Sequence, residues 1–225
     1  MNKPRLGIFG GTYNPVHWGH VRTALSVCEN LHLDKVLMIP ASLPPHKENP
    51  DVTFDQRMTM LKMAIAGHPK LETSDIETQI RPSYTLKTLQ ALQAQSNAKL
   101  YLIMGQDSFM GLPTWYEWQN LLAYCHIVVV SRAGSSTAFP EALVDLLKTH
   151  QADTLPALNA EEKGRIYFQP LPPVAISSTE IRDRLYRGET ISGLCPEGVI
   201  DYIKANHLYG ASSENNLFKR GTYAD

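Results

Sequence analysis

Short apolar runs alternate with stretches of helical periodicity along most of the 225-residue chain. After the first run, for example, Val21, Ala24, Cys28 and Leu31 recur at the spacing of an amphipathic helix. The runs are nearly continuously apolar, which is typical of strands buried on both faces of a parallel sheet. The pattern predicts strands at Leu6–Phe9, Val36–Ile39, Leu100–Met104, Ile127–Val130 and Ile166–Phe168. It predicts helices from about Gly19, around 58–65 and 86–92, and at 140–148, 178–187 and 196–206.

This alternation indicates an α/β fold with a Rossmann-like, doubly wound parallel sheet, whose ligands bind beyond the carboxyl ends of the strands. No internal repeat or interdomain linker is evident, so residues 1–210 are predicted to form one domain. Residues 211–225 are polar and without periodicity, and they are predicted to be a flexible tail. The proline-rich stretch 41–51 is too long for a simple connector and is therefore expected to carry function.

Composition and charge narrow the class of protein. Lys and Arg total 21 against 22 Asp and Glu, and the net charge of −1 argues against a duplex nucleic-acid binder, which needs a basic face. No apolar run approaches the roughly 18 residues of a membrane span, and no signal peptide is evident. Cys28, Cys125 and Cys195 form no CxxC pair, which suits reduced thiols. We therefore expect a cytoplasmic protein without a nucleic-acid or membrane partner.

Residues 10–20 read G-G-T-Y-N-P-V-H-W-G-H and lie between the first predicted strand and the first helix. Gly10 and Gly11 are expected to turn the backbone sharply and to leave room for a phosphate near main-chain N–H groups. His17 and His20 fall just before and inside the first helical turn, where unpaired N–H groups and the helix dipole favour an anion. Imidazoles there can donate hydrogen bonds to phosphate oxygens. The alternative is a glycine turn with two capping histidines.

His17 and His20 also stand three residues apart, a spacing compatible with zinc. A zinc site would need a third ligand, from His46 or a cysteine, and no H-E-x-x-H, CxxC or carboxylate partner accompanies the pair. We therefore predict no metal site built from protein ligands alone. The Walker and dinucleotide-binding glycine patterns are also absent here, which excludes a P-loop kinase and a standard dehydrogenase.

A second constellation is the string I-S-S-T-E-I-R at 176–182. Ser177 and Glu180 predict a capping box that opens a helix, with Ile181 buried on its inner face. Capping does not explain Arg182, because a cation near a helix N-terminus works against the dipole. An anion bound between Arg182 and the helix N-terminus would make this position of the cation favourable. Arg182 with the hydroxyl of Ser178 or Thr179 is therefore predicted to form a second phosphate clamp facing the first.

The two strings resemble the motifs of a known superfamily. G-G-T-Y-N-P-V-H-W-G-H is similar to the G-G-T-F-D-P-x-H-x-G-H motif of the nucleotidyltransferase superfamily with paired histidines, and I-S-S-T-E-I-R to its C-terminal motif. Within it the chain most resembles the bacterial nicotinate-nucleotide adenylyltransferases, which make deamido-NAD. Further strings stand in family order: P-P-H-K at 44–47, P-S-Y-T at 82–85, I-M-G-Q-D-S at 103–108, P-T-W-Y-E-W at 113–118 and Y-I-K-A-N-H-L-Y at 202–209. Tyr13 and Asn14 replace the common Phe-Asp.

The resemblance implies a role for each matching position. His17, His20 and Arg182 would be the catalytic groups, as charge stabilisers and not as bases. The ATP phosphates would lie against Gly10, Gly11, Thr12, Ser178 and Thr179, and a ribose against Gly105 and Asp107. The mononucleotide would meet Lys47 and Arg132 at its phosphate, Trp115 at its pyridine ring, and Thr85 and the Tyr116 backbone at its carboxylate. On residue chemistry alone, Asp107 could instead be a helix N-cap, Trp115 a packed lid and Lys47 a solvated charge.

The implied reaction transfers AMP from ATP to nicotinate mononucleotide and releases pyrophosphate, with Mg²⁺ bound mainly through the ATP phosphates. An adenylyltransferase acting on nicotinamide mononucleotide or on another phosphate-bearing acceptor is one alternative. A non-catalytic nucleotide sensor with the same fold is another, and the retained histidines and Arg182 count against it. The sequence leaves the oligomeric state open, with a homodimer as one option.

Overall fold

The computed structural model describes residues 3–42, 52–132, 138–172 and 174–211. Within them six strands form one sheet in the order β3-β2-β1-β4-β5-β6, and every neighbouring pair is parallel. The strands are β1 (Arg5–Gly11), β2 (Lys35–Pro40), β3 (Leu71–Thr73), β4 (Lys99–Gly105), β5 (His126–Arg132) and β6 (Ile166–Leu171). The predicted Rossmann-like, doubly wound sheet is confirmed. Its order reverses between β1 and β4, which marks the carboxyl ends of these strands as the expected ligand site.

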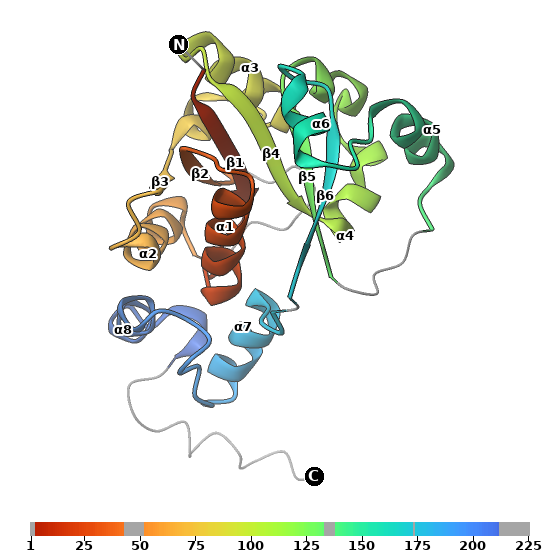
Figure 1. Cartoon of the computed structure of the whole chain (residues 1–225). Helices are drawn as coiled ribbons and strands as arrows, with labels where there is room; N and C mark the ends of the chain where they lie inside the picture. The colour runs from red at the N-terminus through yellow and green to blue at the C-terminus, as the bar shows by residue number, and fades with distance from the viewer. Residues whose placement is uncertain (1–2, 43–51, 133–137, 173, 212–225) are drawn as a thin grey trace.

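Helices cover both faces of the sheet (Figure 1). The first face carries α1 (Trp18–Asn30), α2 (Phe54–Ile65) and α6 (Leu155–Ala160), and α7 (Ser178–Tyr186) and α8 (Glu197–Ala205) extend the same core cluster beyond the strand ends. The second face carries α3 (Thr85–Gln95), α4 (Gln106–Met110) and α5 (Glu141–His150). Short 3₁₀ turns complete the described chain: η1 (Ile76–Gln79), η2 (Leu112–Thr114), η3 (Trp118–Ala123) and η4 (Leu208–Gly210).

Alternate residues of the central strands point to opposite faces of the sheet, and each face has its own core cluster. In β4, Leu102 and Met104 pack with α3 and α4, whereas Tyr101 and Ile103 pack on the opposite face with α1. All four side chains are buried, because helices cover both faces. This is why the strand reads in sequence as a continuous apolar run and not as an alternating one.

The predicted strands and helices are confirmed, with ends that shift by a few residues. The apolar pattern does not predict β3, α4 or α6. Each is short, and β3 contains a single buried apolar residue, Leu71, so no periodicity can develop. The single domain at 1–210 stays a prediction, and nearly all of the expected tail lies outside the described residues.

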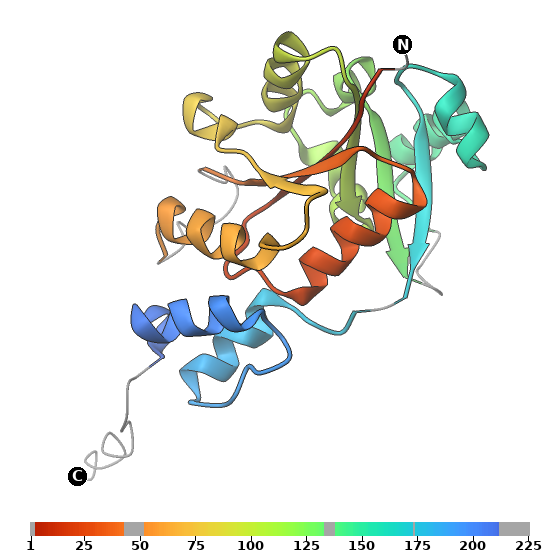
Figure 2. The same cartoon turned by 60° about the vertical axis from the view of Figure 1, so that its left-hand side comes forward.

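The C-terminal helices lie at the functional end of the sheet. Figures 1 and 2 show α7 and α8 beyond the tips of the strands and beside the start of α1. A backbone hydrogen bond of 2.9 Å from Trp18 N–H to the Leu194 carbonyl joins the two regions. The segment that ends the described chain therefore packs against the loop that follows the first strand.

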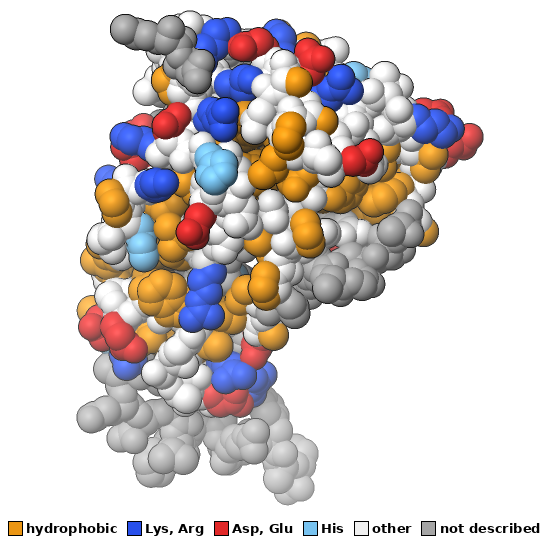
Figure 3. All heavy atoms as spheres, in the orientation of Figure 1, with side chains coloured by type: hydrophobic (Ala, Val, Ile, Leu, Met, Phe, Trp, Pro, Cys, Tyr) orange, Lys and Arg blue, Asp and Glu red, His pale blue; other side chains and the backbone are white. Residues whose placement is uncertain are grey.

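Charges of both signs are interspersed on the face shown in Figure 3. The described helices include none long and apolar enough to cross a membrane.

Candidate active site

A cavity of about 970 Å³ opens at the carboxyl ends of β1 and β4, where the strand order reverses. On one side it is lined by the predicted phosphate contacts Gly10, Gly11, Thr12, His20, Ser178, Thr179 and Arg182. On the other side it is lined by Thr85, Gly105, Asp107, Trp115 and Tyr116. The fold thus brings twelve of the predicted site residues to one cavity. Lys47 and the Arg132 side chain lie outside what the structure describes, although the Arg132 backbone ends β5.

The prediction of a glycine turn at Gly10 and Gly11 is wrong. Both glycines end β1, paired with Ile39 and Pro40 of β2, and neither has a positive φ. The turn comes later, at Tyr13, whose φ is 49° and whose buried hydroxyl donates to the Phe9 carbonyl at 2.6 Å. A Cβ on Gly10 would meet nothing within 4 Å, so the expectation of open space beside the strand end is confirmed.

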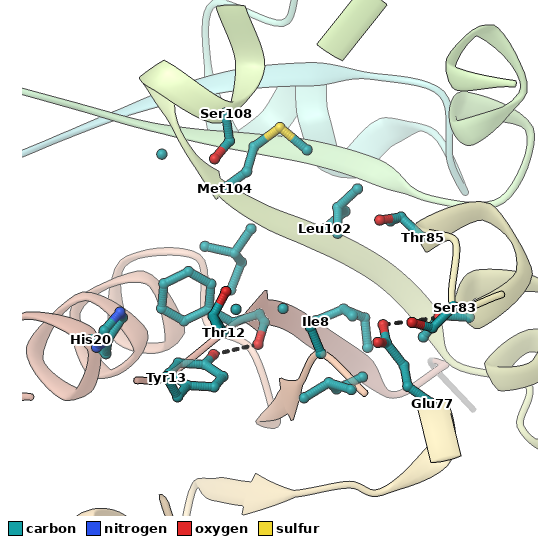
Figure 4. Close-up of a pocket in the computed structure, with 18 of the residues that line it drawn as sticks. Ile8, Thr12, Tyr13, His20, Glu77, Ser83, Thr85, Leu102, Met104 and Ser108 are labelled. Carbon is teal, nitrogen blue, oxygen red and sulfur yellow. Dashed lines mark hydrogen bonds between the residues drawn. The ribbon is translucent and has the colours of Figure 1, made fainter. Parts of the chain in front are cut away.

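The paired histidines open α1 in an unusual arrangement. His17 is the N-cap, and its backbone N–H donates to Nδ1 of His20 at 3.3 Å. The two rings lie 3.8 Å apart at 32°. Figure 4 shows the His20 ring at one end of the cavity, whereas His17, only 6% exposed, does not line it. Among the described residues, Nδ1 of His17 has no hydrogen-bond partner.

Burial keeps both imidazoles neutral in the free protein. It lowers the pKa of His17 to about 4, and it lowers that of His20 well below the usual 6.5, with a further contribution from His17. Among the described residues that line the cavity, the cationic side chain on this side is therefore Arg182.

Gly19, between the two histidines, is required by packing. A Cβ on this residue would lie 2.8 Å from both Cε1 and Nδ1 of His17, closer than side chains approach one another. The glycine therefore leaves the space in which the His17 ring packs against α1 and stacks on His20.

On the same wall, α7 begins with the predicted serine cap, but only half of the capping box forms. Ser177 Oγ accepts from Glu180 N–H at 3.1 Å, while the Glu180 carboxylate pairs with Arg184 instead, at 2.7 Å. Arg182, half-buried, donates to the Asn14 carbonyl at 2.8 Å and to Thr179 Oγ1 at 3.3 Å. It therefore bridges α7 and the loop after β1, as a two-sided clamp requires.

The Ser178 hydroxyl is already engaged inside the protein. It donates to the Pro15 carbonyl at 2.9 Å, so its proton links α7 to the loop and is not free for a phosphate. Ser178 thus reaches the cavity mainly as a structural tie, and Thr179 and Arg182 remain the more direct candidates on this wall.

The opposite wall joins β4, α3 and the 111–118 loop. Gly105, not Asp107, is the N-cap of α4, which removes the capping explanation for Asp107. Trp115 is half-buried against the second core cluster. The rings of Tyr84 and Tyr116 stack 4.3 Å apart at 13°, so the loop and the start of α3 are held together at the cavity.

Two charged residues of the site do not emerge from the sequence pattern. Glu77 lines the cavity and accepts from Ser42 N–H at 3.3 Å, from Thr88 Oγ1 at 3.2 Å and from Ser83 (Figure 4). Burial raises its pKa, an effect that these hydrogen bonds oppose. The sequence around it, S-D-I-E-T-Q, is polar apart from Ile76 and does not single out Glu77 as a site residue.

The second is Arg57 of α2, which is 1% exposed. Its guanidinium donates to the carbonyls of Thr12 at 2.7 Å and Ala41 at 2.8 Å, the residues that follow β1 and β2. Nε of Arg57 has no partner among the described residues. A buried cation that holds the ends of two neighbouring strands fixes the floor under the predicted phosphate site.

The described residues contain no cluster of three His, Cys, Asp or Glu side chains that could hold a metal ion. His46, the histidine considered as a third zinc ligand, lies outside them.

Comparisons with known proteins agree on family and fold. The family described as cytidylyltransferase-like matches residues 8–184. A probable nicotinate-nucleotide adenylyltransferase of Pseudomonas aeruginosa is 41% identical over 210 residues, which cover 92% of this chain and 98% of that one. One from Pseudomonas entomophila is 39% identical over 212 residues, covering 93% and 96%.

Solved structures share the fold at low sequence identity. The Plasmodium falciparum nicotinic acid mononucleotide adenylyltransferase complexed with NaAD superposes with a TM-score of 0.70 at 19% identity, covering 94% of this chain and 100% of that one. A putative nicotinate-nucleotide adenylyltransferase from Vibrio parahaemolyticus gives 0.60 at 18% identity, covering 93% and 97%.

Proposed function

We propose, because the chain belongs to the cytidylyltransferase-like family and within it to the nicotinate-nucleotide adenylyltransferases, that its cavity transfers AMP from ATP to nicotinate mononucleotide. The products are deamido-NAD and pyrophosphate. The observation that carries this assignment is the single cavity that unites the loop after β1, Arg182 of α7 and the aromatic 111–118 loop.

The reaction needs no enzyme nucleophile. A phosphate oxygen of the mononucleotide attacks the α-phosphorus of ATP in line, a new P–O bond forms, and the bond to the oxygen that bridges the α- and β-phosphates breaks. Pyrophosphate leaves with the electron pair. The three cysteine thiols are buried and line no part of the cavity, which agrees with direct transfer. Catalysis then rests on positioning two polyanions and neutralising the charge that develops on pyrophosphate.

We assign the triphosphate to the wall formed by the β1 end and α7. Gly10, Gly11 and Thr12 line this wall, with open space beside Gly10, and the Arg182 guanidinium lies on the same wall next to Thr179. His20 lines this wall and is proposed to donate a hydrogen bond to a phosphate oxygen, since burial leaves it neutral in the free protein. His17 does not line the cavity, and a catalytic role for it is proposed on the family resemblance alone. Bound phosphate favours the protonated imidazole, so ATP is expected to raise the pKa of His20.

We assign the mononucleotide to the opposite wall. Trp115 stacks on the pyridine ring, and Thr85 with the Tyr116 backbone receives the carboxylate. Gly105 and Asp107 lie at the β4 end between the two walls, where a ribose would sit. Lys47 and Arg132 are proposed for the mononucleotide phosphate, on the family resemblance alone.

Mg²⁺ fits this cavity as a companion of ATP and not as a resident ion. Asp107 and Glu77 are carboxylates on its lining, and the hydrogen bonds of Glu77 are spent inside the protein. With too few free ligands for a protein-built cage, the ion would be held mainly by the phosphates, whose charge it neutralises.

A pyrophosphate-release assay with ATP tests the reaction. Turnover with nicotinate mononucleotide is expected, and a Trp115→Ala variant should raise the KM for the mononucleotide while leaving the KM for ATP near its wild-type value. A rise in the ATP KM alone would overturn the stacking role. Turnover only with nicotinamide mononucleotide would correct the substrate, and binding of ATP without turnover would favour a nucleotide sensor.

We also propose a cytoplasmic location, supported by three unpaired, buried thiols, which suit a reducing compartment.

A further inference from the structure

The loop that follows β1 is held along its length by the C-terminal part of the chain. We call residues 12–17 the nucleotide loop. Three groups from the segment 177–209 donate to its carbonyls: Arg182 to Asn14 at 2.8 Å, Ser178 to Pro15 at 2.9 Å and Cys195 Sγ to Val16 at 3.4 Å. The loop is thus shaped from outside itself, by residues more than 160 positions later in sequence.

Asn14 is the most heavily anchored residue of the nucleotide loop. Its carbonyl accepts from Arg182, and its side-chain Oδ1 accepts from the Tyr209 hydroxyl at 2.7 Å. Tyr209 is half-buried and lines the same cavity as Arg182. The two residues therefore grip Asn14 from two directions at the predicted phosphate site.

The backbone holds Tyr209 in a costly conformation. Its φ of 58° lies in the left-handed region, which bulky side chains rarely adopt. The preceding residue, Leu208, is buried in the main core cluster and fixes the approach of the chain. Strained residues of this kind persist where the surrounding contacts determine them, and the hydrogen bond to Asn14 is such a contact.

We infer that Tyr209 is a positioning residue for adenylyl transfer, which acts through Asn14 on the nucleotide loop and on Arg182. The inference rests on the proposed function. Because Arg182 spends one guanidinium N–H on the Asn14 carbonyl, the place of Asn14 sets where the remaining donors of Arg182 meet the phosphates. Tyr209 itself need not touch substrate.

A double-mutant cycle tests this chain of contacts. Tyr209→Phe removes one hydroxyl and keeps the ring, and it should lower kcat about three- to tenfold, the rate equivalent of one net hydrogen bond. The KM for the mononucleotide should stay near the wild-type value. Asn14→Ala removes the acceptor, so adding Tyr209→Phe to it should lower kcat no further. Tyr186→Phe, which alters an 82% exposed tyrosine of α7, is the matched control.

Full activity of Tyr209→Phe, or multiplication of the two single effects in the double variant, would overturn the inference. Amide hydrogen exchange over residues 12–18 separates it from the proposed function, because exchange needs no turnover. Exchange should be faster in Tyr209→Phe than in the wild type and in Tyr186→Phe. A wild-type protein without pyrophosphate release defeats the proposed reaction, while unchanged exchange in Tyr209→Phe defeats the positioning role.

Discussion

Two histidine sites lie at opposite ends of the strands, and their buried imidazoles differ in how their ring nitrogens are paired. We call these ends of the sheet the amino edge and the carboxyl edge. His126 begins β5 at the amino edge, and His17 with His20 follows β1 at the carboxyl edge. Burial lowers the pKa of His126 and of His17 to about 4. A depressed pKa therefore does not tell a structural histidine from one reserved for a ligand.

Hydrogen bonding does distinguish them. Nδ1 of His126 accepts from Arg165 N–H at 3.2 Å, which leaves the proton on Nε2, 3.2 Å from the Glu161 carbonyl. Both ring nitrogens are paired, and the neutral ring ties three segments together. Nδ1 of His17 has no partner among the described residues, and its ring stacks on a second imidazole. An unsatisfied buried group of this kind is unusual, and here it belongs to a ring stacked on His20, the imidazole that lines the cavity.

The strongest test of this difference is to remove an imidazole ring from the carboxyl edge. His20→Ala should lower kcat about 10²–10³-fold, as loss of a group that stabilises developing charge does, while the melting temperature stays close to that of the wild type. Arg182→Ala should behave alike, because it removes the permanent charge. Steady-state kinetics and thermal melts measure both effects. Near-normal turnover by the two purified variants would remove the phosphate assignment.

The opposite pattern is expected at the amino edge. His126→Ala leaves the Arg165 N–H and the Glu161 carbonyl without their partner and opens a cavity beside Tyr101, so it should cost about 2–4 kcal/mol of stability. The kcat of the folded fraction should be unchanged. Urea denaturation and active-site-normalised kinetics measure the two quantities. A large fall in kcat without loss of stability would contradict the structural assignment.

Gly19→Ala probes the packing that holds the His17 ring. The new Cβ would meet that ring at 2.8 Å and force it from its place beneath His20, so kcat should fall about tenfold. Gly198→Ala is the matched control, because it also lies in a helix and its Cβ would find only an ordinary contact at 3.8 Å. Equal activity of the two variants would show that the ring position has no effect on the rate.

The smallest effect concerns acid stability. Each histidine with a folded pKa near 4 and an unfolded value of 6.5 makes the unfolded chain bind more protons between these pH values. The free energy of unfolding should therefore fall as the pH drops from 6.5 towards 4, by up to about 1.4 kcal/mol per pH unit for each such group. Saturating ATP should make this dependence shallower, because phosphate favours the imidazolium at the carboxyl edge.

Urea denaturation at pH 7, 6 and 5 with and without ATP measures the slopes. The His20→Ala variant should lose most of the ATP-dependent difference, since His126 lies at the far edge and does not meet the ligand. If the free energy of unfolding changed equally steeply with pH with and without ATP, the histidine pair would not take up a proton when ATP binds.

The sequence predicts what depends on local order and misses what depends on distant contacts. The β1 strand, the first helix from about Gly19 and the Ser177 cap follow from neighbouring residues, and so they could be predicted. Arg57 looks like an ordinary polar position of a helix, because the carbonyls that satisfy it lie 45 and 16 residues away. Tyr209 meets Asn14 across 195 residues.

The glycine pair shows a different kind of error. Gly10 and Gly11 suggest a turn because glycine permits one, yet the sheet extends through them and the left-handed residue is Tyr13. The glycines are explained by space: Gly10 leaves the strand end open, and at Gly11 an added Cβ would lie 3.1 Å from the Tyr13 ring. Glycine is found both where the backbone needs an unusual φ and where a side chain would not fit. The sequence alone does not distinguish these two reasons, because the surrounding residues determine which one applies.

The grip of the C-terminal segment on the nucleotide loop has a consequence for synthesis. All six described strands precede Ser178 in the chain, so they leave the ribosome before the segment that completes one wall of the phosphate site. Arg182 and Tyr209 arrive last and shape a loop made at the very start. We therefore expect adenylyl transfer to require that α7 and the Tyr209 segment have packed against the nucleotide loop.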